Sequence, residues 1–302
     1  MTTVVALAGY AVLVGAAAPS LLSRARWAHR APALAVAAWQ ALMTTFVVAT
    51  ALAVYHLAIA GKHVHDGFVG LLTACGLITG APARGATPTL SDILALVAPA
   101  VIVLLPLGWF VRCAWRAHRA RRRHLDLLTL VGEPAPEYGA TVVDHDTPAV
   151  YCLPGRFRRV VVTRGALDAL SEEQLRAVLE HERAHIHGRH DLLRLWADAF
   201  SRAFPGLPLS RHAREQTALL VEMIADDRAL RFHRREALAT AMYEVAAGQV
   251  PQVALGAGGT GALIRLRRVL TPQPRPHRAT RLGVVAATVA APLLPLLVAC
   301  GP

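Results

Sequence analysis

The stretch EHERAHIHGRHD, residues 180–191, brings four histidines, two glutamates and an aspartate into twelve positions of a largely apolar chain. Its segment HERAH, residues 181–185, has the pattern H-E-x-x-H. Residues four apart lie on one face of a helix, so His181 and His185 can present two imidazole nitrogens to one metal ion. Glu182 lies beside them, where its carboxylate can take a proton from an attacking water molecule. The stretch therefore predicts a zinc site.

A helix is expected here because of the residues that precede the motif. Ser171 and Gln174 have the spacing of a capping box, and apolar residues such as Leu175 and Leu179 recur at helical spacing. The alternative is a polar helix with solvated histidines. Ala184 and the apolar stripe place the motif on an inward face, where histidines without a ligand would be costly. We therefore favour the metal site.

Two residues compete to be the third ligand. The first is Asp191, because HERAHIHGRHD fits H-E-x-x-H-x-x-G-x-x-D, in which Gly188 lets the chain turn back toward the metal. The second is Glu222, on the next predicted helix. Asp226 lies one turn further on the same face and could accept the free N–H of a ligating imidazole. Glu222 explains more residues and is preferred, although an acidic face paired with Arg228 is the alternative.

The composition predicts membrane-spanning helices. The chain has 302 residues, 54% of them hydrophobic, and a mean hydropathy of +0.40. A span needs about 20 apolar residues, and uncharged stretches of that kind occur at 1–22, 32–60, 93–111 and 282–302. The first stretch lacks the basic segment of a signal peptide. The four cysteines show no C-x-x-C spacing, so neither a disulfide framework nor a thiolate metal site is supported.

The arginines predict the orientation of these spans. They cluster between the first and second spans, after the third span and before the fourth, whereas the loop between the second and third carries no net charge. By the positive-inside rule, the N-terminus lies outside, residues 112–281 lie in the cytosol, and the C-terminus lies outside. The net charge of +12 then reflects contact with anionic lipid headgroups. We therefore expect membrane lipids as partners and no nucleic acid, despite the run RAHRARRRH at 116–124.

Between the third and fourth spans the composition changes to that of a water-facing domain. Eighteen of the twenty acidic residues lie between Asp126 and Glu244. The segment GEPAPEYG (132–139) is rich in turn residues, and ATVVDH, AVYCLP and RVVVT read as short strands. A helix is expected from about residue 171, and Gly188 either ends it or only weakens it before the clear break at 205–208. Further helices are expected at about 210–232, 235–247 and 263–270.

Two blocks carry a family resemblance. PGRFRRVVVTRGALDALSEEQLRAVLEHERAHIHGRHDLL (154–193) and LLVEMIADDRAL (219–230) resemble the BlaR/MecR-type bacterial integral-membrane zinc metallopeptidases, which are gluzincins with the blocks H-E-x-x-H and E-x-x-x-D. The likeness to HtpX/Ste24 membrane proteases is more distant. The β-lactam sensors of this group carry an extracellular domain after the last span. This chain stops at Pro302, so β-lactam sensing is not carried over.

The resemblance implies a multi-pass α-helical membrane protein of about four transmembrane helices with an inserted α+β zincin-like metallopeptidase domain. Zinc would be held by His181, His185 and Glu222, with Glu182 as the catalytic base. A strand ahead of the zinc helix would bind substrate by β-addition. The residues expected in that strand are Arg159, Val160, Val161, Val162 and Thr163.

The expected domains follow from these spans and the resemblance. They are a transmembrane helix at 1–22, a second at 32–60, an extracellular loop at 61–92, a third transmembrane helix at 93–111, a basic juxtamembrane segment at 112–124, a cytosolic zinc metallopeptidase domain at 125–275 and a fourth transmembrane helix at 282–302.

The function expected from the resemblance is zinc-dependent hydrolysis of peptide bonds in a cytosolic or membrane-adjacent protein, with a transcriptional repressor as one candidate. The alternatives are a quality-control protease of membrane proteins and a zinc-binding signalling module without catalytic activity. A second copy of the chain is a further candidate partner. Arg228, His187, His190 and His212 remain open as candidates for stabilising an oxyanion.

Overall fold

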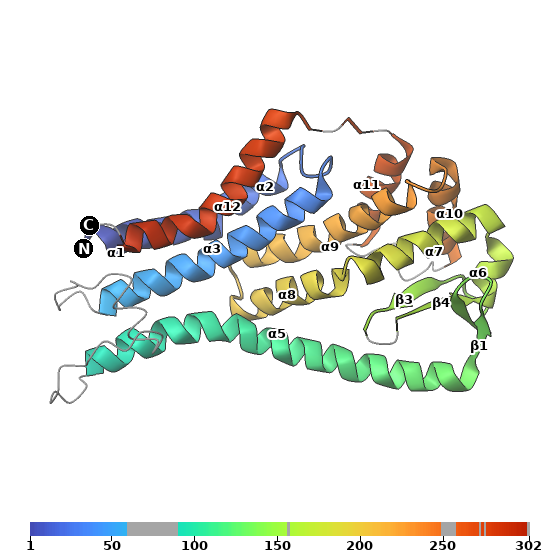
Figure 1. Ribbon diagram of the computed structural model, residues 1–302, viewed down its shortest axis with the longest axis horizontal. Helices are drawn as coiled ribbons and strands as arrows, with labels where there is room; N and C mark the ends of the chain where they lie inside the picture. Colours follow the sequence, from blue (N-terminus) through green and yellow to red (C-terminus); the bar gives the residue numbers. More distant parts are fainter. Residues whose placement is uncertain (59–89, 156–157, 249–257, 272, 275, 301–302) are drawn as a thin grey trace.

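The computed structural model describes residues 1–58, 90–155, 158–248, 258–271, 273–274 and 276–300. The expected extracellular loop 61–92 lies almost entirely outside these residues. Long helices run side by side at one end of the molecule, where both chain termini lie (Figure 1), and a small sheet with short helices forms the other end. The protein is therefore mostly helical, with one small mixed sheet.

Four helical segments are long and apolar enough to cross a membrane, which confirms the expected number of spans by length and composition. The first is α1 (Thr2–Val12) continued by a π-helical turn, Leu13–Ala17, and α2 (Ala18–Ser23). The second is α3 (Pro32–Ala58), and the last is α12 (Arg278–Cys300). These helices indicate a membrane protein.

The third span belongs to a helix much longer than expected. Helix α5 runs without interruption over 42 residues, Leu90–Val131, which is about 60 Å at 1.5 Å per residue, or twice the hydrocarbon thickness. The expected end of this span at residue 111 is therefore not the end of the helix. Its second half forms a stalk that carries the arginine run and leads into the sheet (Figure 1).

The sheet has four strands in the order β1-β2-β4-β3. Strands β2 (Ala140–Val143), β3 (Val150–Leu153) and β4 (Arg159–Thr163) confirm the three expected strands, and the additional β1 (Gly132–Ala135) lies in the segment read as turns. β1 occupies an edge, where its proline is tolerated because a ladder bond is needed on one side only. β2 and β4 are parallel, and the other two pairs are antiparallel.

The helix that carries the motif is α7 (Glu172–His187), preceded by the short α6 (Arg164–Ala169). Its N-terminus has the expected capping box: the Ser171 side chain accepts from the Gln174 N–H and the Gln174 side chain accepts from the Ser171 N–H. Gly188 ends the helix. Apolar side chains of α7, among them Leu175 and Leu179, pack on the strands and fix the helix against the sheet.

Two helices that follow α7 pack on the membrane spans rather than on the sheet. Helix α8 (His190–Ala203), which the sequence did not separate clearly from the motif helix, and helix α9 (Pro208–Ala229) lie between α3 and α5 (Figure 1). Trp39 of α3, Phe200 of α8 and Leu220 of α9 are completely buried in one shared core. The expected boundary between spans and domain is therefore bridged by a continuous apolar core.

The remaining helices close the other side of α9. Helix α10 (Arg235–Gly248) packs against α7, and α11 (Gly258–Leu270) contacts α10 and α9 before the chain enters α12. The expected basic helix 263–270 is the second part of α11. Arg265 and Arg268 of this helix contact acidic residues of α9, and the contacts of Arg265 belong to the candidate site.

Candidate metal centre

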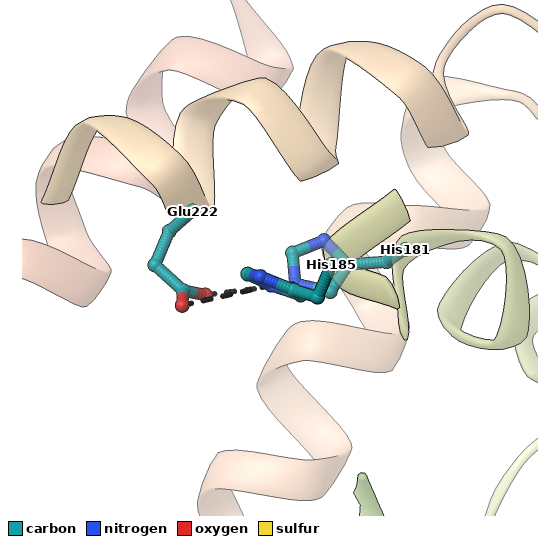
Figure 2. Close-up of side chains that lie close together, drawn as sticks. All are labelled: His181, His185 and Glu222. Carbon is teal, nitrogen blue, oxygen red and sulfur yellow. Dashed lines mark hydrogen bonds and ion pairs between the residues drawn. The ribbon is translucent and has the colours of Figure 1, made fainter. Parts of the chain in front are cut away.

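Two imidazoles of α7 point toward one carboxylate of α9 (Figure 2). The Nε2 atoms of His181 and His185 are 3.2 Å apart. Glu222 Oε2 lies 3.5 Å from His181 Nε2, and Glu222 Oε1 lies 3.6 Å from His185 Nε2. Among the residues that the structure describes, these three form the group of histidine and acidic side chains that could hold a metal ion.

The spacing of these atoms fits zinc. Zinc bonds to nitrogen and oxygen ligands are about 2.0–2.2 Å long, so neighbouring ligand atoms of a tetrahedral site lie about 3.3 Å apart. The three observed separations of 3.2, 3.5 and 3.6 Å are close to that value. Two nitrogens and one carboxylate also leave a fourth position open, as catalytic zinc sites require.

Asp226 lies behind the first histidine of the motif. His181 Nδ1 is 3.0 Å from Asp226 Oδ1, and Asp226 is completely buried. A carboxylate in this place fixes the ring so that Nε2 is the free ligand atom. Asp226 is held in turn by Arg265 of α11, which donates two hydrogen bonds to it at 2.8 and 2.9 Å.

Arg265 also contacts the candidate ligand itself, because its guanidinium lies 3.0 Å from Glu222 Oε2. One arginine thus compensates the negative charges of the buried Asp226 and the partly buried Glu222. The sequence analysis missed this residue. Its helix was expected as a basic segment leading to the membrane, and no local pattern connects it to residues on α9.

His190 lies behind the second histidine. Its Nδ1 is 2.9 Å from His185 Nδ1, and the residue is 3% exposed. Burial and the neighbouring charge of His185 lower the pKa of His190 to about 4, so its neutral ring can accept a hydrogen bond from His185. A Cβ added to Gly188 would come within 2.4 Å of His190 Nε2. The glycine therefore makes room for this imidazole, and Arg189 completes the corner with a positive φ of 48°.

The charges of the site keep it in an unusual protonation state. Burial would lower the pKa of His181, but hydrogen bonds to Asp226 and Glu222 outweigh it and raise that pKa to about 9. Burial would raise the pKa of Glu222, but both histidines and Arg265 hold it well below its usual range. The metal-free site therefore contains an ionised carboxylate beside a protonated imidazole, and metal binding would displace that proton.

Glu182 is partly buried on the same helix, and β3 runs next to it. Burial, followed by the negative charge of Glu182, raises the pKa of the Cys152 thiol on β3. The expected substrate strand, Arg159–Thr163, is formed as β4 but is wrong as a docking edge. Its two sides are already paired with β2 and β3. The edge of the sheet that borders the site belongs to β3.

The alternative third ligand, Asp191, is not brought into the cluster. Its carboxylate pairs with Arg121 of the α5 stalk at 2.9 Å, which joins the stalk to the corner between α7 and α8. Arg228 pairs with Glu180 at 3.1 Å rather than with Glu222 or Asp226. A further cation near the site is Arg194 of α8, half exposed and 3.5 Å from Glu222 Oε1.

A helix-borne H-E-x-x-H pair completed by a glutamate from a second helix is an arrangement typical of metal-dependent hydrolases. Residues 114–204 match Peptidase family M48. The match covers the α5 stalk, the sheet, α7 and α8, and it ends before Glu222. No curated protein and no solved structure matches the chain. Fold, site and family match together support a metallopeptidase in a membrane protein.

Proposed function

We propose that the protein is a zinc-dependent endopeptidase embedded in a membrane, and that it hydrolyses peptide bonds of a cytosolic or membrane-adjacent protein. The observation that carries the proposal is the grouping of His181, His185 and Glu222 at zinc-like separations, with both histidines on a segment that matches a peptidase family. Glu182 adds a carboxylate on the same helix turn, which a purely structural metal site would not need.

A zinc ion held by these side chains would supply Lewis acidity, lowering the pKa of a water molecule and polarising the scissile carbonyl. Glu182 accepts the proton of the attacking water and passes it to the nitrogen of the leaving amine as the C–N bond breaks. Asp226 and His190 keep the two ligating imidazoles in the tautomer that leaves Nε2 free. Arg265 holds Glu222 and Asp226 in place.

The substrate backbone would add to the free edge of β3. The Thr163 N–H donates to the Ala149 carbonyl, and hydrogen-bonded pairs alternate along an antiparallel ladder. The backbone N–H and C=O groups of Val150 and Cys152 therefore turn toward the edge. An extended peptide pairing there would run past Glu182.

The direction of the chain in the membrane follows from its arginines. We infer an N-terminus outside, residues 112–281 in the cytosol and a C-terminus outside. The substrate is then a protein that reaches the cytosolic surface. The resemblance to the BlaR/MecR group suggests a transcriptional repressor as that substrate. Membrane lipids and a second copy of the chain are further candidate partners, and no nucleic-acid partner is proposed.

The experiment replaces the proposed base. Purified full-length protein and Glu182→Gln are compared for zinc content and for cleavage of casein, with Glu180→Gln as a matched control on the same helix. We expect Glu182→Gln to keep its zinc and to lose activity at least a hundredfold, the usual contribution of a general base. The control Glu180→Gln should keep both its zinc and its cleavage activity.

Other outcomes separate the alternatives. Undiminished cleavage by Glu182→Gln would remove this residue from the mechanism. A wild-type protein that holds zinc but releases no fragments from any protein of its own membranes would be a signalling module. Broad cleavage of damaged membrane proteins in cells, compared with the Glu182→Gln strain by proteomics, would indicate quality control.

A further inference from the structure

A cavity of about 960 Å³ lies on the side of the α7–α9 pair that faces the membrane spans. It is bounded by the start of α3, the corner between α7 and α8, the C-terminal end of α9 and the start of α12. None of its lining residues is Glu182 or a member of the candidate metal cluster. The cavity is therefore separate from the proposed catalytic groups.

The lining is strongly basic. It includes one carboxylate, Asp227, and six arginines: Arg30, Arg228, Arg231, Arg235, Arg268 and Arg281. Asp227 is fully engaged by Arg268, at 2.7 and 2.8 Å, and Arg228 is paired with Glu180.

Arg235 donates to the Val269 carbonyl at 2.8 Å. Apart from Arg235, three of these arginines have no carboxylate partner within the described part of the chain: Arg30, Arg231 and Arg281. Arg30 lies in the turn before α3, Arg231 lies just after α9, and Arg281 lies in the first turn of α12. Like charges gathered around one cavity repel each other, and an anion between them would relieve that repulsion. Guanidinium groups are suited to phosphate because they can donate two parallel hydrogen bonds.

The position of the cavity indicates where such an anion comes from. Pro32, the first residue of the α3 span, and Val285, in the second turn of the α12 helix, both line it. Two membrane-crossing segments thus begin at this level, where lipid headgroups meet the hydrocarbon. Leu34 and Val285 add apolar wall on the membrane side, next to the arginines.

We propose that this cavity binds the phosphate-bearing headgroup of an anionic phospholipid, with Arg30, Arg231 and Arg281 around the phosphate. Gly188 and His190 line the opposite wall. The headgroup therefore contacts the corner that holds His185, and lipid binding stabilises the same corner that the metal site uses. The proposal does not depend on peptidase activity.

Binding is measured on the detergent-purified full-length protein by native mass spectrometry, with phosphatidylglycerol, phosphatidylcholine and inorganic phosphate as separate probes. We expect one tightly held phosphatidylglycerol. The double variant Arg231→Gln/Arg281→Gln should weaken that binding at least tenfold, since each arginine near a headgroup contributes about fivefold. The matched control Arg122→Gln/Arg123→Gln, on the α5 stalk, should change it less than twofold.

An equal loss of phosphatidylglycerol affinity in both double variants would mean that the lipid is attracted to basic surface in general, and it would overturn the proposal. An unchanged affinity in Arg231→Gln/Arg281→Gln would overturn it as well. Inorganic phosphate binding as tightly as the lipid would overturn the lipid assignment.

A second pair of variants guards against altered membrane insertion. Arg231 does not flank a span, so Arg231→Gln alone should lower the affinity about fivefold while zinc content stays at the wild-type level. The exposed neighbour Arg234, which does not line the cavity, serves as its control, and Arg234→Gln should bind the lipid normally. An equal loss in Arg234→Gln would contradict a defined site.

Discussion

His190 stands behind His185 in the same way that Asp226 stands behind His181. The partner of a ligating imidazole affects metal affinity because it fixes which ring nitrogen is free. The pattern H-E-x-x-H identified the two imidazoles from sequence. Asp226 was also expected from sequence as a partner of a ligating imidazole, because it lies one turn after Glu222. The contact of His190 with His185 was not expected, because it depends on the turn at Gly188.

Replacing His190 with alanine should weaken zinc binding about 10- to 100-fold, the usual effect of losing a group that orients a ligand. The affinity is measured by competition with a chelator. His187→Ala is the control, because His187 is exposed at the end of α7 and its ring hydrogen-bonds to the Arg183 carbonyl. Equal losses in the two variants would mean that His190 does not orient His185.

The raised pKa of His181 predicts how zinc affinity depends on pH. Ligation needs the neutral ring, and in the metal-free protein this ring stays protonated up to a pKa of about 9. Because His181 must lose this proton, the affinity for zinc should rise about tenfold per pH unit up to about pH 9 and should level off above it.

Zinc titrations of the purified protein at several pH values measure this dependence. Asp226→Asn removes a partner that raises the pKa, so its affinity should level off at a lower pH. A wild-type affinity that levels off near 6.5, the ordinary histidine value, would contradict the assignment.

The helix α7 was predictable because its capping box and apolar stripe are local patterns. The role of each strand was not, because the order of strands in a sheet is set by contacts between distant segments. RVVVT was correctly expected as a strand, yet it is enclosed by β2 and β3 and offers no edge. The edge next to the site belongs to β3. Its sequence, VYCL, is apolar like the centre of RVVVT and gives no sign that it lies at an edge.

The substitution Val150→Pro tests whether the substrate pairs with β3 rather than with β4. Val150→Pro removes a backbone N–H that faces the edge and leaves the β3–β4 ladder intact. It should raise KM for a fluorogenic peptide cleaved by the wild type about fivefold, because one such hydrogen bond is worth about 1 kcal/mol. The turnover number should stay near that of Val150→Ala, the control that loses the same side chain but keeps the N–H. Equal KM values in the two variants would exclude β-addition at this position.

For the whole molecule, the main difference between expectation and structure is the shared core of spans and domain. Hydropathy separated a water-facing segment from four spans because charge is distributed unevenly along the chain. The hairpin of α8 and α9 nevertheless packs on α3 and α5, with Phe200 and Leu220 buried against Trp39. The helix that carries Glu222 is thus held from the membrane side by spans and from the other side by α11.

The sequence alone determined the spans, the helix that carries the motif, and the preference for Glu222 over Asp191. Those features depend on local spacing and composition, which a single chain displays directly. Only the tertiary structure decided that Arg121 pairs with Asp191, that Arg265 and His190 support the site, and that β3 is the edge. Each of these contacts joins residues of different elements, and the packing of those elements is a property of the whole chain.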